Sequence, residues 1–171
     1  MAYLTRGFTL TLIIMFLFLV GVLYVSANQA YWTASPEIAN QTRKQIEAER
    51  QTVTAQSIFI NNLLVSIALA IPAIGLFPFL IVWHNTGQII GLLSLAYGIP
   101  PSNYILNLTV LAFPELAAYT ILASENIYVT SLAIVKGGAK ERLLTQSWKS
   151  LLIYLTLLII GAVTEMAMIG G

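Results

Sequence analysis

The stretch FTLTLIIMFLFLVGVLYV, residues 8–25, contains no charged side chain and is mostly aliphatic or aromatic. An α-helix rises about 1.5 Å per residue, so roughly 20 apolar residues cross the hydrocarbon core of a bilayer. The run exceeds the roughly 7–15 apolar residues of a cleaved signal peptide, although Val25-Ser26-Ala27 looks like a cleavage site. We therefore expect residues 8–25 to remain in the protein as its first membrane span.

The whole chain has the composition of a membrane protein. Of its 171 residues, 58% are hydrophobic and 9% are charged, whereas roughly 25% are charged in soluble proteins. A soluble protein of this size has too much surface to cover with so few charges, but lipid solvates an apolar exterior. The net charge of +1 provides no basic field for nucleic acid, and the absence of cysteine excludes disulfides, cysteine-based metal sites and thiol catalysis.

The apolar segments predict an all-α fold, a polytopic transmembrane helical bundle that forms a single membrane domain over residues 1–171. We expect about five spans, at residues 8–25, 57–71, 76–97, 103–135 and 149–168. Pro72 and Gly75 separate the second span from the third, and Pro100 and Pro101 end the third, because proline cannot continue a helix.

The fourth apolar stretch, residues 103–135, is too long for one span of about 20 residues and is broken at Pro114. In one interpretation, residues 103–113 are re-entrant or interfacial and the span begins at Pro114. In the other, the span covers residues 103–123, and residues 124–135 lie on the inner surface. The polar run Ser124-Glu125-Asn126 slightly favours the second interpretation.

The segment 35–56 is the strongly polar part of the chain, and we expect it to form an extramembrane helical stalk between the first two spans. Ser35-Pro36-Glu37 is typical of a helix start. No glycine or proline follows from Glu37 to Ile71, which predicts one helix that rises from the membrane and continues into the second span. Asn40-Gln41-Thr42 matches an acceptor sequon, so Asn40 is a candidate glycosylation site.

Basic residues near the spans predict the orientation. Arg6 lies at the N-terminus, and Lys136, Lys140, Arg142 and Lys149 lie between the fourth and fifth spans. Short loops rich in lysine and arginine stay in the cytoplasm. The chain crosses the membrane four times between these two regions, so both lie on the same side. We therefore expect a multi-pass protein of the cell membrane with a cytoplasmic N-terminus. The stalk and the C-terminus would then lie outside.

Polar side chains within the spans are the candidate functional residues, because each is costly in lipid. The third span has polar and small side chains on one face, which predicts close helix packing and interhelical hydrogen bonds, or a proton or ligand site. Glu115 would be protonated or paired if the fourth span is continuous. The polar candidates are Asn61, Asn62, His84, Asn85, Gln88, Glu115 and Glu165, and the helix-packing candidates are Gly87, Gly91, Ser94 and Gly161.

Four sequence elements together resemble the stage II sporulation protein M family over residues 58–168. They are Ile58-Phe59-Ile60-Asn61-Asn62-Leu63, the stretch from His84-Asn85-Thr86-Gly87 to Gly91, Phe113-Pro114-Glu115, and a last span with Glu165. The family's His-Gly before the glutamate is absent here, where Leu111-Ala112 stands. The resemblance implies a small multi-spanning protein of the cell envelope that works with partners, in spore formers during septal membrane migration. The positions that it carries over are Asn61, Asn85, Gly91, Glu115 and Glu165.

We therefore expect a non-enzymatic membrane scaffold that binds lipid and either its own copies or other membrane proteins. No phosphate loop, nucleophile elbow or zinc-binding motif occurs, so the sequence indicates no catalytic, cofactor or metal site. One alternative is a proton-coupled transporter or channel subunit that uses Glu115, His84 and Glu165, and another is an accessory subunit of a larger complex. A cavity that reaches Glu115, with Glu115 facing His84, would favour transport. Glycine faces that meet another protomer would favour the scaffold.

Overall fold

The computed structural model describes residues 4–170, and all regular elements within that range are helices. The all-α class is therefore confirmed. In chain order the helices are α1 (Arg6–Thr33), α2 (Pro36–Arg50), α3 (Ala55–Leu69), α4 (Leu76–Tyr97), α5 (Pro101–Leu111), α6 (Phe113–Ser131), the π-helix η1 (Leu132–Lys136), α7 (Ala139–Thr145) and α8 (Ser147–Gly170).

Several of these helices are long and apolar enough to cross a membrane. Within the described residues, the four that qualify singly are Arg6–Thr33, Leu76–Tyr97, Phe113–Val135 and Ser147–Ala167. The bent pair formed by α2 and α3 raises the count to as many as five. Many large apolar side chains on these helices are exposed, Leu17 and Phe77 among them, as expected for surfaces that lipid covers.

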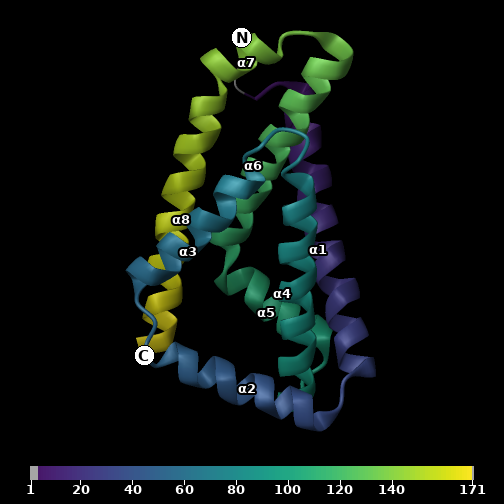
Figure 1. Cartoon of the computed structure of the whole chain (residues 1–171), viewed down its shortest axis with the longest axis vertical. Coiled ribbons are helices and arrows are strands. Elements are labelled where there is room, and N and C mark those ends of the chain that lie inside the picture. The colour runs from purple at the N-terminus through teal and green to yellow at the C-terminus, as the bar shows by residue number, and fades with distance from the viewer. Residues whose placement is uncertain (1–3, 171) are drawn as a thin grey trace.

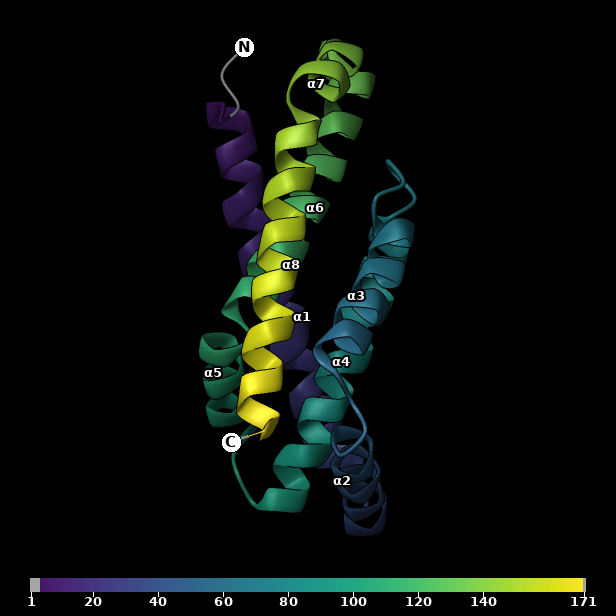
Figure 2. The ribbon, with the colours of Figure 1, turned by 90° about the vertical axis from the view of Figure 1, so that its left-hand side faces the viewer.

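The long helices run along the long axis of the molecule, and the short ones close its two ends. α2 lies across one end, where α8 also finishes, and α7 lies at the other end beside the start of α1 (Figure 1). α1 packs against α4 and α6, and α6 packs against α8. α3 and α5 lie on opposite sides of α8 (Figure 2).

Small residues let α1 and α4 approach each other closely. A Cβ atom placed on Gly87 would lie 2.6 Å from the Cβ of Ser26, and one on Gly91 would lie 2.8 Å from the Cβ of Ala30. Neither distance is compatible with a real side chain, so glycine is required at both positions. This contact extends α1 well past the predicted limit at residue 25, because its second half packs on α4.

A row of aromatic rings forms the core between α4, α6 and α8. The ring centroids are 6.1 Å apart for Phe79 and Trp83, 5.5 Å for Trp83 and Tyr119, and 6.5 Å for Tyr119 and Tyr154. Edge-to-face pairs of this kind add to the free energy of burial. The Tyr154 hydroxyl also forms a hydrogen bond with Ser66 of α3, which attaches the shorter helix to the core.

The prediction of one continuous helix from residue 37 to residue 71 is wrong. α2 ends at Arg50, α3 begins at Ala55, and the two helices are bent by 117°. The break follows from Thr54, whose hydroxyl accepts from the Ser57 amide at 3.1 Å while the Ser57 hydroxyl accepts from the Thr54 amide at 2.9 Å. This capping box starts a new helix without glycine or proline.

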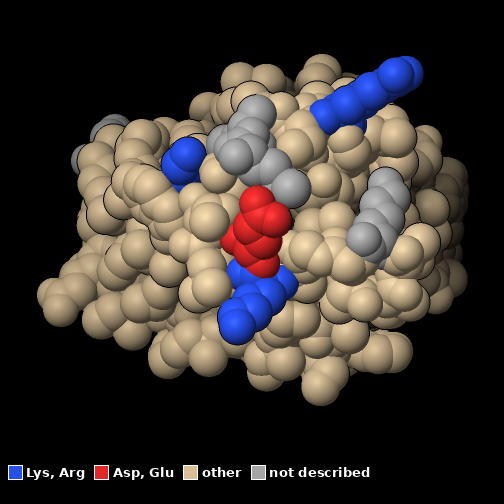
Figure 3. All heavy atoms as spheres, turned by 90° about the horizontal axis from the view of Figure 1, so that it is seen from above, with Lys and Arg blue, Asp and Glu red and all other residues tan. Residues whose placement is uncertain are grey.

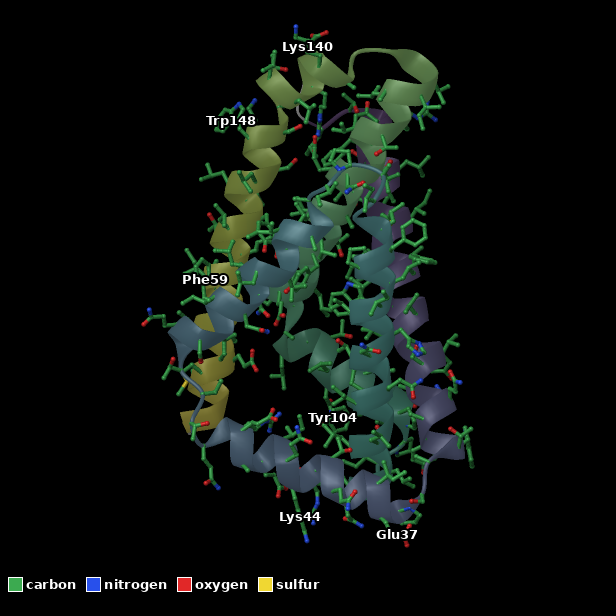
Figure 4. The ribbon with its side chains drawn as sticks, in the orientation of Figure 1. Glu37, Lys44, Phe59, Tyr104, Lys140 and Trp148 are labelled. Atoms are coloured by element: carbon green, nitrogen blue, oxygen red, sulfur yellow. The ribbon has the colours of Figure 1, made fainter. Side chains whose placement is uncertain are left out.

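α2 consequently packs against the end of α4 and does not project from the bundle as a straight stalk. The Tyr97 hydroxyl at the end of α4 donates to Glu47 at 3.0 Å. The Arg43 guanidinium lies 5.8 Å from the centroid of the Tyr97 ring. These contacts hold the polar helix α2 across the end of the bundle. Figure 4 shows two of its other side chains, Lys44 and Glu37, at the outer edge of the molecule.

The fourth apolar stretch contains a helix break at Ala112, two residues before Pro114. α5 ends at Leu111, a new helix begins at Phe113, and the candidate span runs from Phe113 to Val135. Ser124, Glu125 and Asn126, the polar run of this stretch, are buried in α6. The Asn126 amide donates to the carbonyls of Leu69 at 2.9 Å and Ile71 at 2.6 Å, so it caps the end of α3.

Candidate functional site

Glu115 and Glu165, the two acids expected in the fourth and fifth spans, lie in the same region of the structure. Glu115 is in the first turn of α6, directly after the break at Ala112. Gly161 of α8 packs on it, because a Cβ placed on Gly161 would lie 3.3 Å from the Glu115 Cβ. Glu165 follows one turn later on α8, which brings both carboxyls to the same side of the α6–α8 contact.

A partly enclosed cavity of about 420 Å³ connects the two acids. Arg50, at the C-terminal end of α2, lines the same cavity, and Asn62 of α3 lies beside the Glu115 carboxyl. Figure 4 shows Tyr104, another lining residue, between α5 and α2. The complete lining is Arg50, Ile99, Tyr104, Asn107, Leu108, Leu111, Ala112, Glu115, Gly161 and Glu165.

The charges around this cavity are not paired at short range. Among the side chains that the structure describes, the salt bridges are Arg43–Glu47 and Arg142–Glu125, so neither cavity acid forms one there. With both carboxyls ionised and Arg50 protonated, the lining carries a formal charge of −1. Two carboxylates that share a low-dielectric space repel each other, and a proton or a cation relieves that repulsion.

A third acid, Glu125, has the opposite environment at the other end of the bundle. Its carboxylate accepts from Arg142 Nε at 2.9 Å and from a second Arg142 nitrogen at 2.7 Å. The Ser147 and Ser150 hydroxyls donate to the same carboxylate at 2.7 and 2.5 Å. Arg142 is 1% exposed, and its guanidinium lies 4.4 Å from the centroid of the Phe8 ring.

The Glu125–Arg142 cluster joins four helices and was missed by the sequence analysis. Phe8 comes from α1, Glu125 from α6, Arg142 from α7 and Ser150 from α8. Figure 3 looks onto this end and shows few charged groups on a largely uncharged surface. The sequence signal that could have found the cluster is an acid inside an apolar helix followed by an arginine after the next turn, because a buried charge requires a partner.

His84 and Gln88 point to α1 and not to Glu115. His84 Nδ1 lies 2.9 Å from the Ser26 hydroxyl. Gln88 donates to the Ser26 carbonyl at 3.2 Å and to the Gln29 side chain at 3.4 Å. The structure therefore does not form the pairing of His84 with Glu115 that a proton relay between them would need.

The remaining predicted residues divide between buried and exposed positions. Ser94 is fully buried on α4, whereas Asn61 on α3 and Asn85 on α4 are exposed. Asn40, on the exposed surface of α2, donates to the Pro36 carbonyl at 3.0 Å. The glycine faces at Gly87 and Gly91 are occupied by α1 of the same chain, so they are not available to another protomer.

Comparison with known proteins finds no matching family model, no similar curated protein and no similar solved structure.

Proposed function

We propose that the chain is a multi-pass membrane protein that binds one positive charge, a proton or a monovalent cationic group, in the cavity between Glu115 and Glu165. In this proposal it acts as the binding component of a transport system or as an accessory subunit of one, and it catalyses no reaction. The two acids of the cavity, which come from different helices, carry this proposal.

Three features of the cavity support binding of a single positive charge. Its formal charge of −1 is balanced by one cation. Arg50 belongs to the hydrophilic helix α2. The cavity therefore lies near the polar end of the bundle, where a polar ligand can reach it. The cavity lining presents a pair of carboxylates, Glu115 and Glu165, whose oxygens are suitable ligands for a cationic group.

The proposed topology has five crossings, with the N-terminus and residues 136–149 in the cytoplasm and with α2 and the C-terminus outside. Two observations support it. The start of α1 and α7 lie at the same end of the molecule, opposite α2 (Figure 1). Basic residues that flank the spans concentrate at that first end. The binding cavity would then open towards the outer side of the membrane.

The resemblance to the stage II sporulation protein M family supports the same site. The positions that it carries over include Glu115 and Glu165, the two acids of the cavity. A scaffold function within that family remains the second candidate. The glycine faces first considered for it are filled by α1, so it would need another surface.

Binding can be tested with the protein in lipid nanodiscs and methylammonium as the probe cation. We expect the wild type to bind methylammonium saturably in place of a proton that the two carboxyls share at rest, and to release that proton, which a pH dye detects. Glu115→Gln keeps the shape and much of the hydrogen bonding of the carboxyl, but it cannot carry the charge. It should therefore reduce binding and proton release at least tenfold, and Glu165→Gln should do the same.

The matched control is Glu141→Gln, because Glu141 is an exposed acid on α7 at the opposite end. That variant should bind as the wild type does. If Glu115→Gln and Glu165→Gln both fold, and both match the wild type in proton release and in methylammonium binding, then the cavity is not a cation site.

A further inference from the structure

α4 has a third face that none of the described residues covers. Gly87 and Gly91 contact α1, and the buried side chains Phe79 and Trp83 belong to the core next to α6. At 100° per residue, the opposite side of the helix carries a different set of residues. These are Phe77, Ile81, Asn85 and Ile89, and all four are exposed.

Asn85 is the polar member of this face and lies deep in the helix. It comes nine residues after Leu76 and twelve before Tyr97. At about 1.5 Å per residue, it is therefore about 13 Å from one end of α4 and about 18 Å from the other. If α4 crosses the membrane as its length and composition allow, this position lies within the hydrocarbon layer.

The Asn85 carboxamide has no hydrogen-bond partner within the described residues. Its neighbours differ, since His84 bonds to Ser26, and Gln88 bonds to Ser26 and Gln29. Lipid tails offer neither donors nor acceptors, so an amide exposed to them stays unsatisfied at a considerable cost in free energy. A polar group from another protein must therefore cover this face in the membrane.

We propose that the cover is a second copy of this chain, which pairs α4 with α4 around Asn85. A carboxamide both donates and accepts, so it is complementary to an identical group. All copies insert in the same direction, so a two-fold axis along the membrane normal brings each Asn85 to the depth of its counterpart. A different partner would need a polar group placed at that depth independently.

The residues around Asn85 fit this arrangement. Ile81 lies one turn before Asn85 and Ile89 one turn after it, so both would pack across the same axis and exclude lipid from the amide pair. A single asparagine in an apolar helix contact fixes the register of the two helices. This interface involves none of the cavity residues, so the inference stands apart from the proposed cation site.

Cysteine cross-linking in native membranes tests the interface, because the chain contains no cysteine. Ile81→Cys and Ile89→Cys should each form a disulfide-linked dimer on mild oxidation. The control is Leu17→Cys, since Leu17 is exposed on α1 away from the α4 face. It should form at least tenfold less dimer under the same oxidation.

Asn85→Leu then distinguishes the contribution of the Asn85 amide from nonspecific association of the exposed apolar side chains. We expect the variant to retain its helical content but to raise the dimer dissociation constant at least tenfold, measured by subunit counting in dilute vesicles. Ile89→Leu, which keeps the face apolar and the amide in place, should dimerise as the wild type does. A monomeric wild type, an unchanged dimer in Asn85→Leu, or cross-links only to a different protein would each overturn the proposal.

Discussion

Replacing Arg142 by methionine removes the guanidinium that pairs with Glu125 in the interior of the bundle. Both side chains are buried, with Arg142 1% exposed and Glu125 6% exposed. Removal of one partner from a buried ion pair costs about 3–5 kcal/mol, because the other charge is left uncompensated. The lost contacts with the Phe8 and Tyr128 rings add to this cost, whereas Ser147 and Ser150 still donate to the carboxylate and reduce it.

We therefore expect Arg142→Met to lower the free energy of unfolding by about 3–5 kcal/mol. The double variant Arg142→Met with Glu125→Leu should recover to within about 2 kcal/mol of the wild type, because an apolar pair replaces an ion pair at little cost. The assay is unfolding in mixed micelles by titration with a denaturing detergent, followed by tryptophan fluorescence. Lys140→Met, an exposed change on the same helix, should stay within about 0.5 kcal/mol.

Two results would refute this reasoning. One is a loss of less than about 1 kcal/mol in Arg142→Met, which would mean that Glu125 reaches water or another cation in the membrane. The other is a double variant whose loss equals the sum of the two single losses. Additivity would show that the two side chains do not interact energetically, since coupled pairs deviate from it by about 0.5–3 kcal/mol.

Two further predictions concern helix packing and orientation. Gly91→Ala should destabilise the protein by about 1–3 kcal/mol in the same assay, because the new Cβ would overlap the Cβ of Ala30. The control Gly21→Ala, whose Cβ meets nothing within 4 Å, should not destabilise it; equal losses would contradict the close contact of α1 and α4. Cysteines introduced by Lys44→Cys and Lys140→Cys should react with a membrane-impermeant maleimide from opposite sides, the first in intact cells and the second only after lysis. Labelling of both from the same side would contradict the proposed topology.

The limits of α4 could be predicted from sequence, because strong local signals mark both ends. The helix occupies residues 76–97, the range that the proline and glycine positions indicate. Gly98 adopts a φ of 67° at its C-cap, a left-handed conformation that glycine reaches without strain. Where the stop signal depends on side-chain hydrogen bonds, as at Thr54 and Ser57, residue types alone did not reveal it.

The location of the polar run 124–126 could not be predicted, because its partners are distant in sequence. Polar side chains in an apolar stretch indicate either contact with water or a buried partner, and Asn126 donates to the carbonyls of Leu69 and Ile71. Glu125 meets Arg142 only because the chain reverses at Gly137 and Gly138, both with positive φ, and α7 then turns back onto the bundle. Gly161 was more informative, since it is a predicted helix-packing position, and the residue that packs on it is Glu115.

The three glutamates in the bundle differ in what they could gain from a bound cation. Glu125 already has a guanidinium and two hydroxyl donors in fixed positions, so a cation there would have to displace Arg142. Glu115 and Glu165 have no salt bridge within the described residues, and they share a cavity with each other. The proposed function therefore places the positive charge at the cavity near α2, because binding there relieves the repulsion between two carboxylates and breaks no internal ion pair.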